Sequence, residues 1–163
     1  MELTVNSERD LNIGRVIKSV VRGGITLLER YAAPILDLGI RLWVSQVFFM
    51  SGLTKIQSWD TTLALFENEY QVPLLPPEIA AYAGTFTELF FPVLLVLGIG
   101  TRFAAGVLFV FNIIAVLSYP DLGEVGLKDH QYWGLLLLIT LIHGPGKVSV
   151  DHFIRQRFFG AER

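Results

Sequence analysis

The feature that most constrains this chain is a set of four long apolar runs, which together cover about half of it. They lie at about residues 35–54, 79–99, 103–119 and 131–146, and each carries at most two charged residues. A transmembrane helix needs about 20 mostly apolar residues. Helices of soluble proteins keep a polar face that recurs every 3.6 residues, and these runs lack one. The sequence therefore predicts an all-α, polytopic membrane protein with a four-transmembrane-helix bundle.

Composition supports a membrane protein and excludes several functional classes. Hydrophobic residues make up 52% of the chain and charged residues only 17%, against roughly 25% charged in soluble domains. The net charge of −2 gives no basic surface for nucleic acid, so no nucleic-acid partner is expected. The chain has no cysteine, which excludes thiol–disulfide chemistry and thiolate metal ligands from its own residues.

The charges of the loops predict the orientation of the chain in the membrane. Ten of its 13 lysines and arginines lie in the N-terminal tail, the second loop or the C-terminal tail, whereas the first and third loops carry seven acidic residues. Short basic loops stay on the cytoplasmic side, so both termini are expected to be cytoplasmic. Six tyrosines and tryptophans cluster near the predicted outer boundary, where aromatic rings favour the headgroup level; they are Trp59, Tyr70, Tyr82, Tyr119, Tyr132 and Trp133.

Three segments lie outside the predicted spans. Residues 1–34 form an N-terminal cytoplasmic tail, in which apolar and basic residues alternate between Leu11 and Leu28 as in an amphipathic interfacial helix. Anchoring to anionic lipid and docking of a cytoplasmic partner are the two explanations for this helix, and the membrane is entered after Pro34. In the outer loop, Asp60 is expected to cap a short helix through Tyr70. Residues 150–163 form the C-terminal cytoplasmic tail.

Polar residues inside the apolar runs are the candidates for function, because an ionisable group in lipid is costly unless it faces protein or water. Counting about 1.5 Å per residue places Glu88 and Asn112 roughly 15 Å deep, near the bilayer centre, with Gln46 at a similar depth. Ala80, Gly84 and Glu88 are spaced four residues apart, and such small-residue stripes mark closely packed helix faces. Glu88 is therefore expected to point into the bundle.

Arg41 is the only strong cation within any run, so it is the expected charge partner of Glu88. Pro92 follows Glu88 by four residues and frees the Glu88 backbone carbonyl at the same level. Two interpretations stay open, a structural ion pair that orients the helices and a ligand or proton site. Lys55, which closes the first run, is interpreted as a lysine that snorkels to the outer headgroups.

The histidines do not predict a metal site. His130 and His143 lie about 20 Å apart along one helix, so they cannot bind one ion, and no acidic cluster has the spacing of a metal cage. His143 shares a helical face with Thr140 and is a candidate for proton exchange. No metal ligand is predicted.

Taken in order, these motifs resemble the DoxX family of small four-helix bacterial membrane proteins. The resemblance rests on Arg41, on SGLTK at 51–55, on Glu88 within its span, on GIGTRFAAG at 98–106 and on GPGKVSVDHFIRQRF at 144–158. It implies a multi-pass protein of the bacterial inner membrane, related to subunits of quinone-linked oxidoreductases. Family membership alone does not establish an activity.

The resulting hypothesis is a membrane subunit that assists a partner oxidoreductase and has no intrinsic cofactor. It would bind quinone, or another small lipophilic ligand, in an apolar space between its helices. Glu88 would accept a proton, with Arg41 as its charge partner or as a donor to a quinone carbonyl. The alternative is a non-catalytic scaffold or a small-solute, proton-coupled permease. The ligand-binding candidates are Gln46, Asn112, Thr140 and His143.

Overall fold

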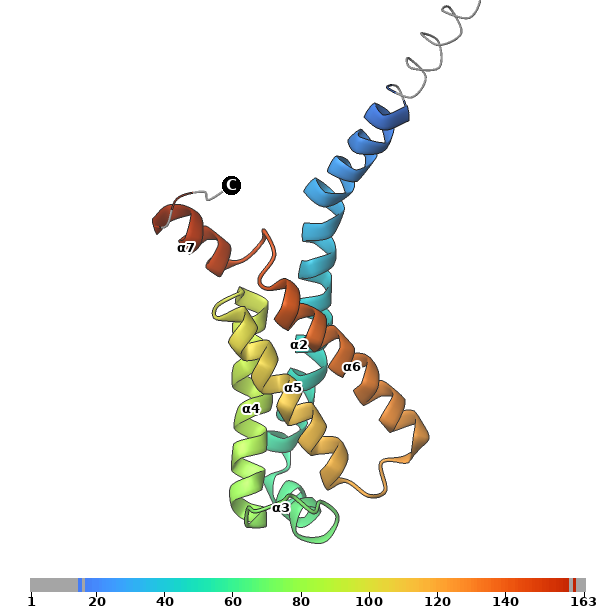
Figure 1. Ribbon diagram of the computed structural model, residues 1–163. Coiled ribbons are helices and arrows are strands. Elements are labelled where there is room, and N and C mark those ends of the chain that lie inside the picture. The colour runs from blue at the N-terminus through green and yellow to red at the C-terminus, as the bar shows by residue number, and fades with distance from the viewer. Residues whose placement is uncertain (1–14, 16, 159, 161–163) are drawn as a thin grey trace, which may run out of the picture. The chain divides into compact units, whose positions relative to one another are not determined.

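The structure is a computed structural model that describes residues 15, 17–158 and 160 (Figure 1). Helices are the only regular elements in these described residues. The chain divides into two units, residues 1–36 and 37–163, and each is considered by itself. The all-α prediction is confirmed for the part of the chain that is described.

The described part of the first unit is helical and, up to Ala33, exposed. A π-helical turn, η1 (Leu28–Ala32), precedes Pro34, and the helix continues unbroken from Ile17 to Gln57. The wider π-turn gives room for the ring of Pro34, which would clash in a regular helix. Entry into the membrane after Pro34 stays a prediction. An interfacial location stays a prediction, and Leu11 to Gly14 and Val16, on which it partly rests, lie outside the described residues.

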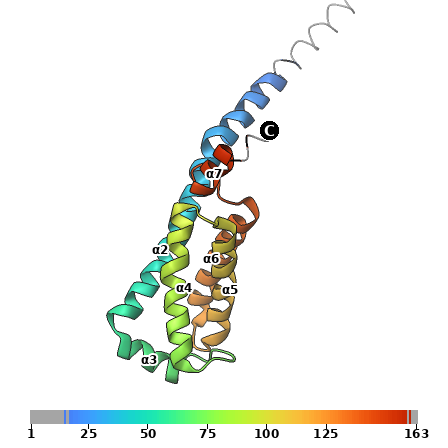
Figure 2. The same cartoon turned by 90° about the vertical axis from the view of Figure 1, so that its left-hand side faces the viewer.

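The second unit holds most of α2 (Ala33–Gln57) and all of the helices that follow it. Helix α4 packs against α5, and α5 packs against α6. The short helix α3 packs on α4 and lies at one end of the bundle, with α7 at the opposite end in both views (Figures 1 and 2). The bounds are α3 (Trp59–Asn68), α4 (Pro77–Leu97), α5 (Thr101–Ser118), α6 (Gly123–His143) and α7 (Val150–Phe158).

Three described helices are long and apolar enough to cross a membrane: Ile17–Gln57, Pro77–Leu97 and Thr101–Ser118. They contain the first three predicted runs, within a few residues at each end. Helix α6 covers most of the fourth run, but its first turns carry Glu124, Lys128 and Asp129, and it is not among the three. A count of four membrane crossings stays a prediction.

The helix ends follow local sequence signals. Helix α4 begins with Pro77 at its first turn and ends at Gly98, whose φ of 71° is left-handed, and Gly100, at φ 55°, precedes α5. A glycine adopts such angles without steric cost, which explains the tight α4–α5 turn. Helix α3 begins two residues earlier than expected, so Ser58 and not Asp60 occupies the N-cap position.

The core joins α2, α4, α5 and α6. Val44 and Phe48 of α2, Leu95 of α4, Leu108 of α5 and Leu137 of α6 form one buried apolar cluster. A smaller cluster lies under α3 and consists of Phe66, Ala80 and Ala81. Apolar side chains, among them Trp43 (64% exposed) and Phe103 (68% exposed), also cover much of the outer surface, as expected for helices that face lipid.

Candidate functional site

The candidate site is a cavity of about 520 Å³ in the second unit, bounded by α2 to α6. Its size falls within the range of about 300–1,000 Å³ that is usual for small-molecule sites. Most of the wall is apolar, with Val47, Phe111, Ile114 and Trp133 among the lining residues. A minority of polar side chains interrupts this wall; they are Ser51, Lys55, Tyr70, Thr87, Glu88, Ser118, Tyr119 and His130.

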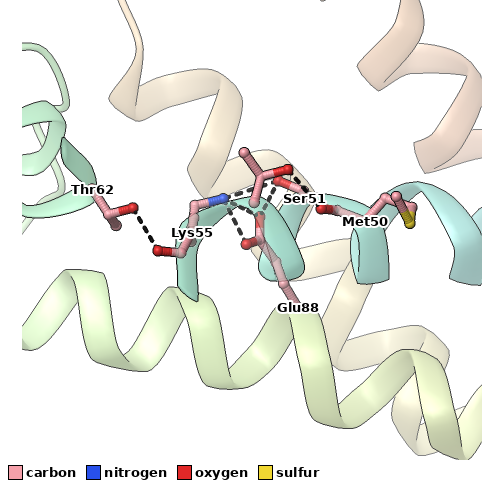
Figure 3. A network of polar contacts seen from close by, with 6 residues as sticks. Met50, Ser51, Lys55, Thr62 and Glu88 are labelled. Atoms are coloured by element: carbon pink, nitrogen blue, oxygen red, sulfur yellow. Dashed lines mark hydrogen bonds and ion pairs between the residues drawn. The ribbon is translucent and has the colours of Figure 1, made fainter. Parts of the chain in front are cut away.

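An ion pair between Lys55 and Glu88 lies in the cavity wall (Figure 3). The Lys55 ammonium donates to both oxygens of the Glu88 carboxylate, at 2.8 and 2.6 Å, and to Ser51 Oγ at 2.9 Å. The Ser51 hydroxyl donates to Glu88 Oε1 at 3.1 Å. The side chains of Lys55 and Glu88 are only 17% and 7% exposed, so each charge depends on the other for its stabilisation.

The sequence places these groups together by helix geometry. Ser51 and Lys55 are one helical turn apart on α2, and therefore share a face. Between them, Gly52 brings α2 against α4, because a Cβ on Gly52 would lie 2.8 Å from Leu89 Cγ. Thr62 of α3 donates its hydroxyl to the Lys55 backbone carbonyl at 3.0 Å, which fixes the end of α2 (Figure 3).

Glu88 therefore has a different partner from the one expected, and the proposed Arg41–Glu88 pair is wrong. Arg41 is 1% exposed and donates through Nη1 to the Leu95 carbonyl at 3.1 Å. Its Nη2 donates to the Val148 carbonyl. Both acceptors lie in the region of the α4–α5 turn and the segment before α7, and Arg41 does not line the cavity.

The turn between α4 and α5 holds Asp151, the first acid of α7. Its carboxylate accepts hydrogen bonds of 2.9 Å from the backbone N–H groups of Gly100 and Thr101 and from the Thr101 hydroxyl. Partial burial opposes ionisation of this group. The hydrogen bonds, together with Arg155, outweigh that effect and lower the pKa of Asp151 below its usual range. The GIGT turn at residues 98–101 and the VSVD segment at residues 148–151 are thus held together, and we call this contact the clasp.

A second polar pair joins α5 and α6. Asn112, 4% exposed, donates through Nδ2 to the His130 backbone carbonyl at 2.9 Å, and its Oδ1 lies 2.8 Å from His130 Nδ1. His130 lines the cavity and packs edge-on against Trp133, with 4.7 Å between ring centroids. A buried amide and an imidazole that satisfy each other hold the ring in one orientation.

A third polar group lies where α5 ends. Ser118 is 4% exposed, and its hydroxyl has no hydrogen-bond partner among the described residues, although its carbonyl accepts from the Gln71 N–H at 2.7 Å. The rings of Tyr70 and Tyr119 lie beside it in the same wall, 5.1 Å apart. Burial raises the pKa of the Tyr70 hydroxyl, and Tyr119 adds to this effect, so the phenol stays protonated at neutral pH.

The remaining predicted ligand-binding residues lie outside the cavity wall. Gln46 and His143 are exposed, and Thr140 is buried with its hydroxyl bonded to the Leu136 carbonyl at 2.9 Å. Asn112 does not line the cavity, but it forms hydrogen bonds with His130, which does. Of the residues proposed from the sequence, Glu88 alone lines the cavity, and sequence reasoning missed Ser51, Lys55 and His130.

No group of three or more His, Asp or Glu side chains that could hold a metal ion occurs within the described residues. The polar groups in the apolar wall of the cavity are one ion pair, one imidazole and several hydroxyls, and an apolar wall with a few polar groups is usual in small-molecule sites.

Comparison with known proteins identifies relatives over most of the chain. The family model described as DoxX matches residues 36–120. An uncharacterized protein of Haemophilus influenzae is 32% identical over 126 residues, which cover 72% of this chain and 82% of that protein. A Bacillus subtilis protein named "Putative oxidoreductase CatD" is 29% identical over 119 residues, covering 71% of this chain and 84% of that protein. No solved structure matches the chain.

Proposed function

The chain belongs to the DoxX family, and on that premise we propose that it is a membrane subunit that binds quinone, or another small lipophilic ligand, and assists a partner oxidoreductase. The observation that carries this proposal is the cavity of about 520 Å³ whose apolar wall contains the buried Lys55–Glu88 pair. Such a wall suits a ligand with an apolar body and a few polar atoms.

The residues of the cavity fit a quinone-sized ligand. A quinone needs an apolar space and one or two hydrogen-bonding groups for its carbonyls. The hydroxyl of Ser118 is buried in the wall without a partner among the described residues, and an unsatisfied buried hydroxyl costs free energy that a ligand carbonyl would recover. Lys55 already directs its ammonium at Glu88 and Ser51, so Ser118 is the better carbonyl donor.

In this proposal the Lys55–Glu88 ion pair lies beside the bound ligand and exchanges protons with it. Glu88 keeps the role of proton acceptor that its position in the sequence suggested, and Lys55 takes the role of charge partner in place of Arg41. The relay of contacts from Lys55 through Ser51 to Glu88 keeps the carboxylate at the cavity wall.

The proposal includes the membrane topology. Helices α2, α4, α5 and α6 would each cross a bacterial inner membrane, with both termini in the cytoplasm as the loop charges indicate. The Bacillus subtilis relative is named as an oxidoreductase, which supports a redox partner. The partner would supply the redox centre.

The same ion pair also favours a second candidate, a scaffold or permease. The Lys55–Glu88 pair joins α2 to α4, next to the close contact at Gly52, so it could serve only to lock the helices together. In a proton-coupled permease, Glu88 would change its protonation state during transport. Quinone that co-purifies together with a redox partner separates the first proposal from both.

The test is purification of the full chain from its native membrane in mild detergent, followed by mass spectrometry of everything that co-purifies. We expect enriched quinone and a stoichiometric redox partner. In an Ala115→Trp variant, which fills the cavity at a lining position, the quinone should be lost. The matched control is Ile113→Trp, on the same helix at a 43% exposed position outside the lining. Bulk lipid alone in the wild type, or equal quinone in both variants, contradicts the proposal.

A further inference from the structure

The hydrogen bonds of Asn112 fix the chemical state of His130, and this bears on which ligands the cavity accepts. A backbone carbonyl can only accept a hydrogen bond. The Asn112 atom that faces the His130 carbonyl at 2.9 Å must therefore be the donor, Nδ2. The Asn112 oxygen then faces His130 Nδ1 at 2.8 Å, and Nδ1 must donate to it.

This arrangement leaves the other ring nitrogen of His130 without a proton. A neutral imidazole carries one N–H, and here that N–H is on Nδ1. At neutral pH a histidine is mostly neutral unless an anion pairs with it. The neighbouring Asp129 carboxylate acts on His130 electrostatically, but it forms no ion pair with the imidazole among the described residues, where the ion pair found joins Lys55 to Glu88. His130 Nε2 is thus a bare acceptor on the ring edge that Asn112 does not occupy.

His130 lines the cavity together with Trp133 and Glu88. Nε2 has no hydrogen-bond partner among the described residues, since the one side-chain contact of the imidazole in hydrogen-bond range is to Asn112. The two carboxylate oxygens of Glu88 are already engaged by Lys55 and Ser51. His130 is therefore the nitrogen acceptor that the cavity offers to a ligand.

From this geometry we propose that the cavity recognises a lipophilic ligand that carries a hydroxyl, a phenol or hydroquinone, whose O–H donates to His130 Nε2. A quinone has only acceptor oxygens, which cannot bond to a bare nitrogen. The site would thus hold the reduced, hydroxyl-bearing form more tightly than the oxidised form. Asn112 is a positioning residue that sets the tautomer. This inference rests on the proposed function, because it names the ligand class of the same cavity.

The test compares two probes that differ in one methyl group, 2-bromo-4-hexylphenol and its methyl ether, which has no O–H. The full chain is reconstituted in lipid nanodiscs with Trp43→Phe and Trp59→Phe, so that Trp133, in the cavity wall, is the sole remaining tryptophan of the three. Quenching of its fluorescence by bromine reports binding, after subtraction of partition into empty nanodiscs. The same titrations are made with His130→Phe and with the matched control His143→Phe, on the exposed opposite end of α6.

We expect the phenol to bind about tenfold more tightly than the ether, the effect of one hydrogen bond in a dry site. His130→Phe should remove this preference, and His143→Phe should keep it. Equal binding of both probes, tighter binding of the ether, or a preference that survives His130→Phe overturns the inference while the proposed cavity function stands. If neither probe binds the wild type, the proposed function fails as well. The comparison in the wild type is decisive even if His130→Phe does not fold.

Discussion

Removal of Lys55 should expose how much the Lys55–Glu88 pair contributes to stability. In Lys55→Met, the ammonium and its contacts of 2.8 and 2.6 Å to the carboxylate are lost, while Glu88 stays buried with 7% of its side chain exposed. Breaking a buried pair from one side costs about 3–5 kcal/mol. We expect a loss near the lower end, about 3 kcal/mol, because Ser51 still donates to Glu88 at 3.1 Å.

A double-mutant cycle separates the pair from its burial. In Lys55→Met with Glu88→Leu, both charges are replaced by apolar groups of similar volume, so the free energy of unfolding should return to within about 1 kcal/mol of the wild type. The assay is unfolding in mixed micelles by titration with a denaturing detergent, followed by far-ultraviolet circular dichroism. Lys128→Met is the matched control, because Lys128 is exposed on α6, and it should change the free energy by less than about 0.5 kcal/mol.

Two results would refute this reasoning. If Lys55→Met unfolds within about 0.5 kcal/mol of the wild type, the ion pair contributes nothing to the fold. If the double variant loses as much as the sum of the two single variants, the two charges act independently and do not form a coupled pair.

Three further predictions concern other parts of the second unit. Gly52→Ala should destabilise the protein by about 1–3 kcal/mol through overpacking, since the new Cβ would lie 2.8 Å from Leu89 Cγ. The control Gly39→Ala, where a Cβ would have nothing within 4 Å, should stabilise the protein by about 0.5–1 kcal/mol. The melting temperatures of the two variants test this, and equal shifts would contradict the close approach at Gly52. Arg41→Met should speed hydrogen exchange at the Asp151 amide, which donates to the Gly98 carbonyl, because it releases the neighbouring segment; unchanged exchange would show that the arginine is not part of the clasp. Folding lowers the pKa of Asp151. The contribution of the ionised Asp151 to the free energy of unfolding is therefore complete above the pKa of the unfolded chain, about 4, and is lost as pH falls through the pKa of the folded protein. The melting temperatures of the wild type and of Asp151→Asn should thus differ at pH 7 and converge on acidification.

The sequence predicted the helices well and the partner of Glu88 badly, for a physical reason. Apolar runs report burial or lipid contact directly, so their bounds followed from hydropathy. The depth of Glu88, by contrast, was obtained by counting about 1.5 Å per residue along its helix, which assumes that all helices cross the membrane at the same level. Lys55 in the last turn of α2 meets Glu88 about 16 Å along α4 by the rise per residue, so the two helices are staggered by about three turns.

The Asn112–His130 pair, in contrast, was open to prediction. Helices α5 and α6 form a hairpin around Asp121, and both residues lie nine positions from it. An antiparallel hairpin places such equidistant residues side by side. A polar amide in an apolar helix needs a partner, and counting outward from the turn would have found the imidazole. The Ser51–Lys55 spacing of four with Gly52 between them was a similar signal for a packed face.

The contact between Arg41 and Val148 spans 107 positions of the chain, and this has a consequence for how the protein is made. Synthesis proceeds from the N-terminus, so the ribosome delivers Arg41 long before the segment that receives its guanidinium. In the meantime a cation on an apolar helix is costly in lipid. A nascent chain should therefore leave the insertion machinery only after the segment around Val148 has emerged. Truncations ahead of this segment should then be degraded by membrane quality control even though every long helix is complete.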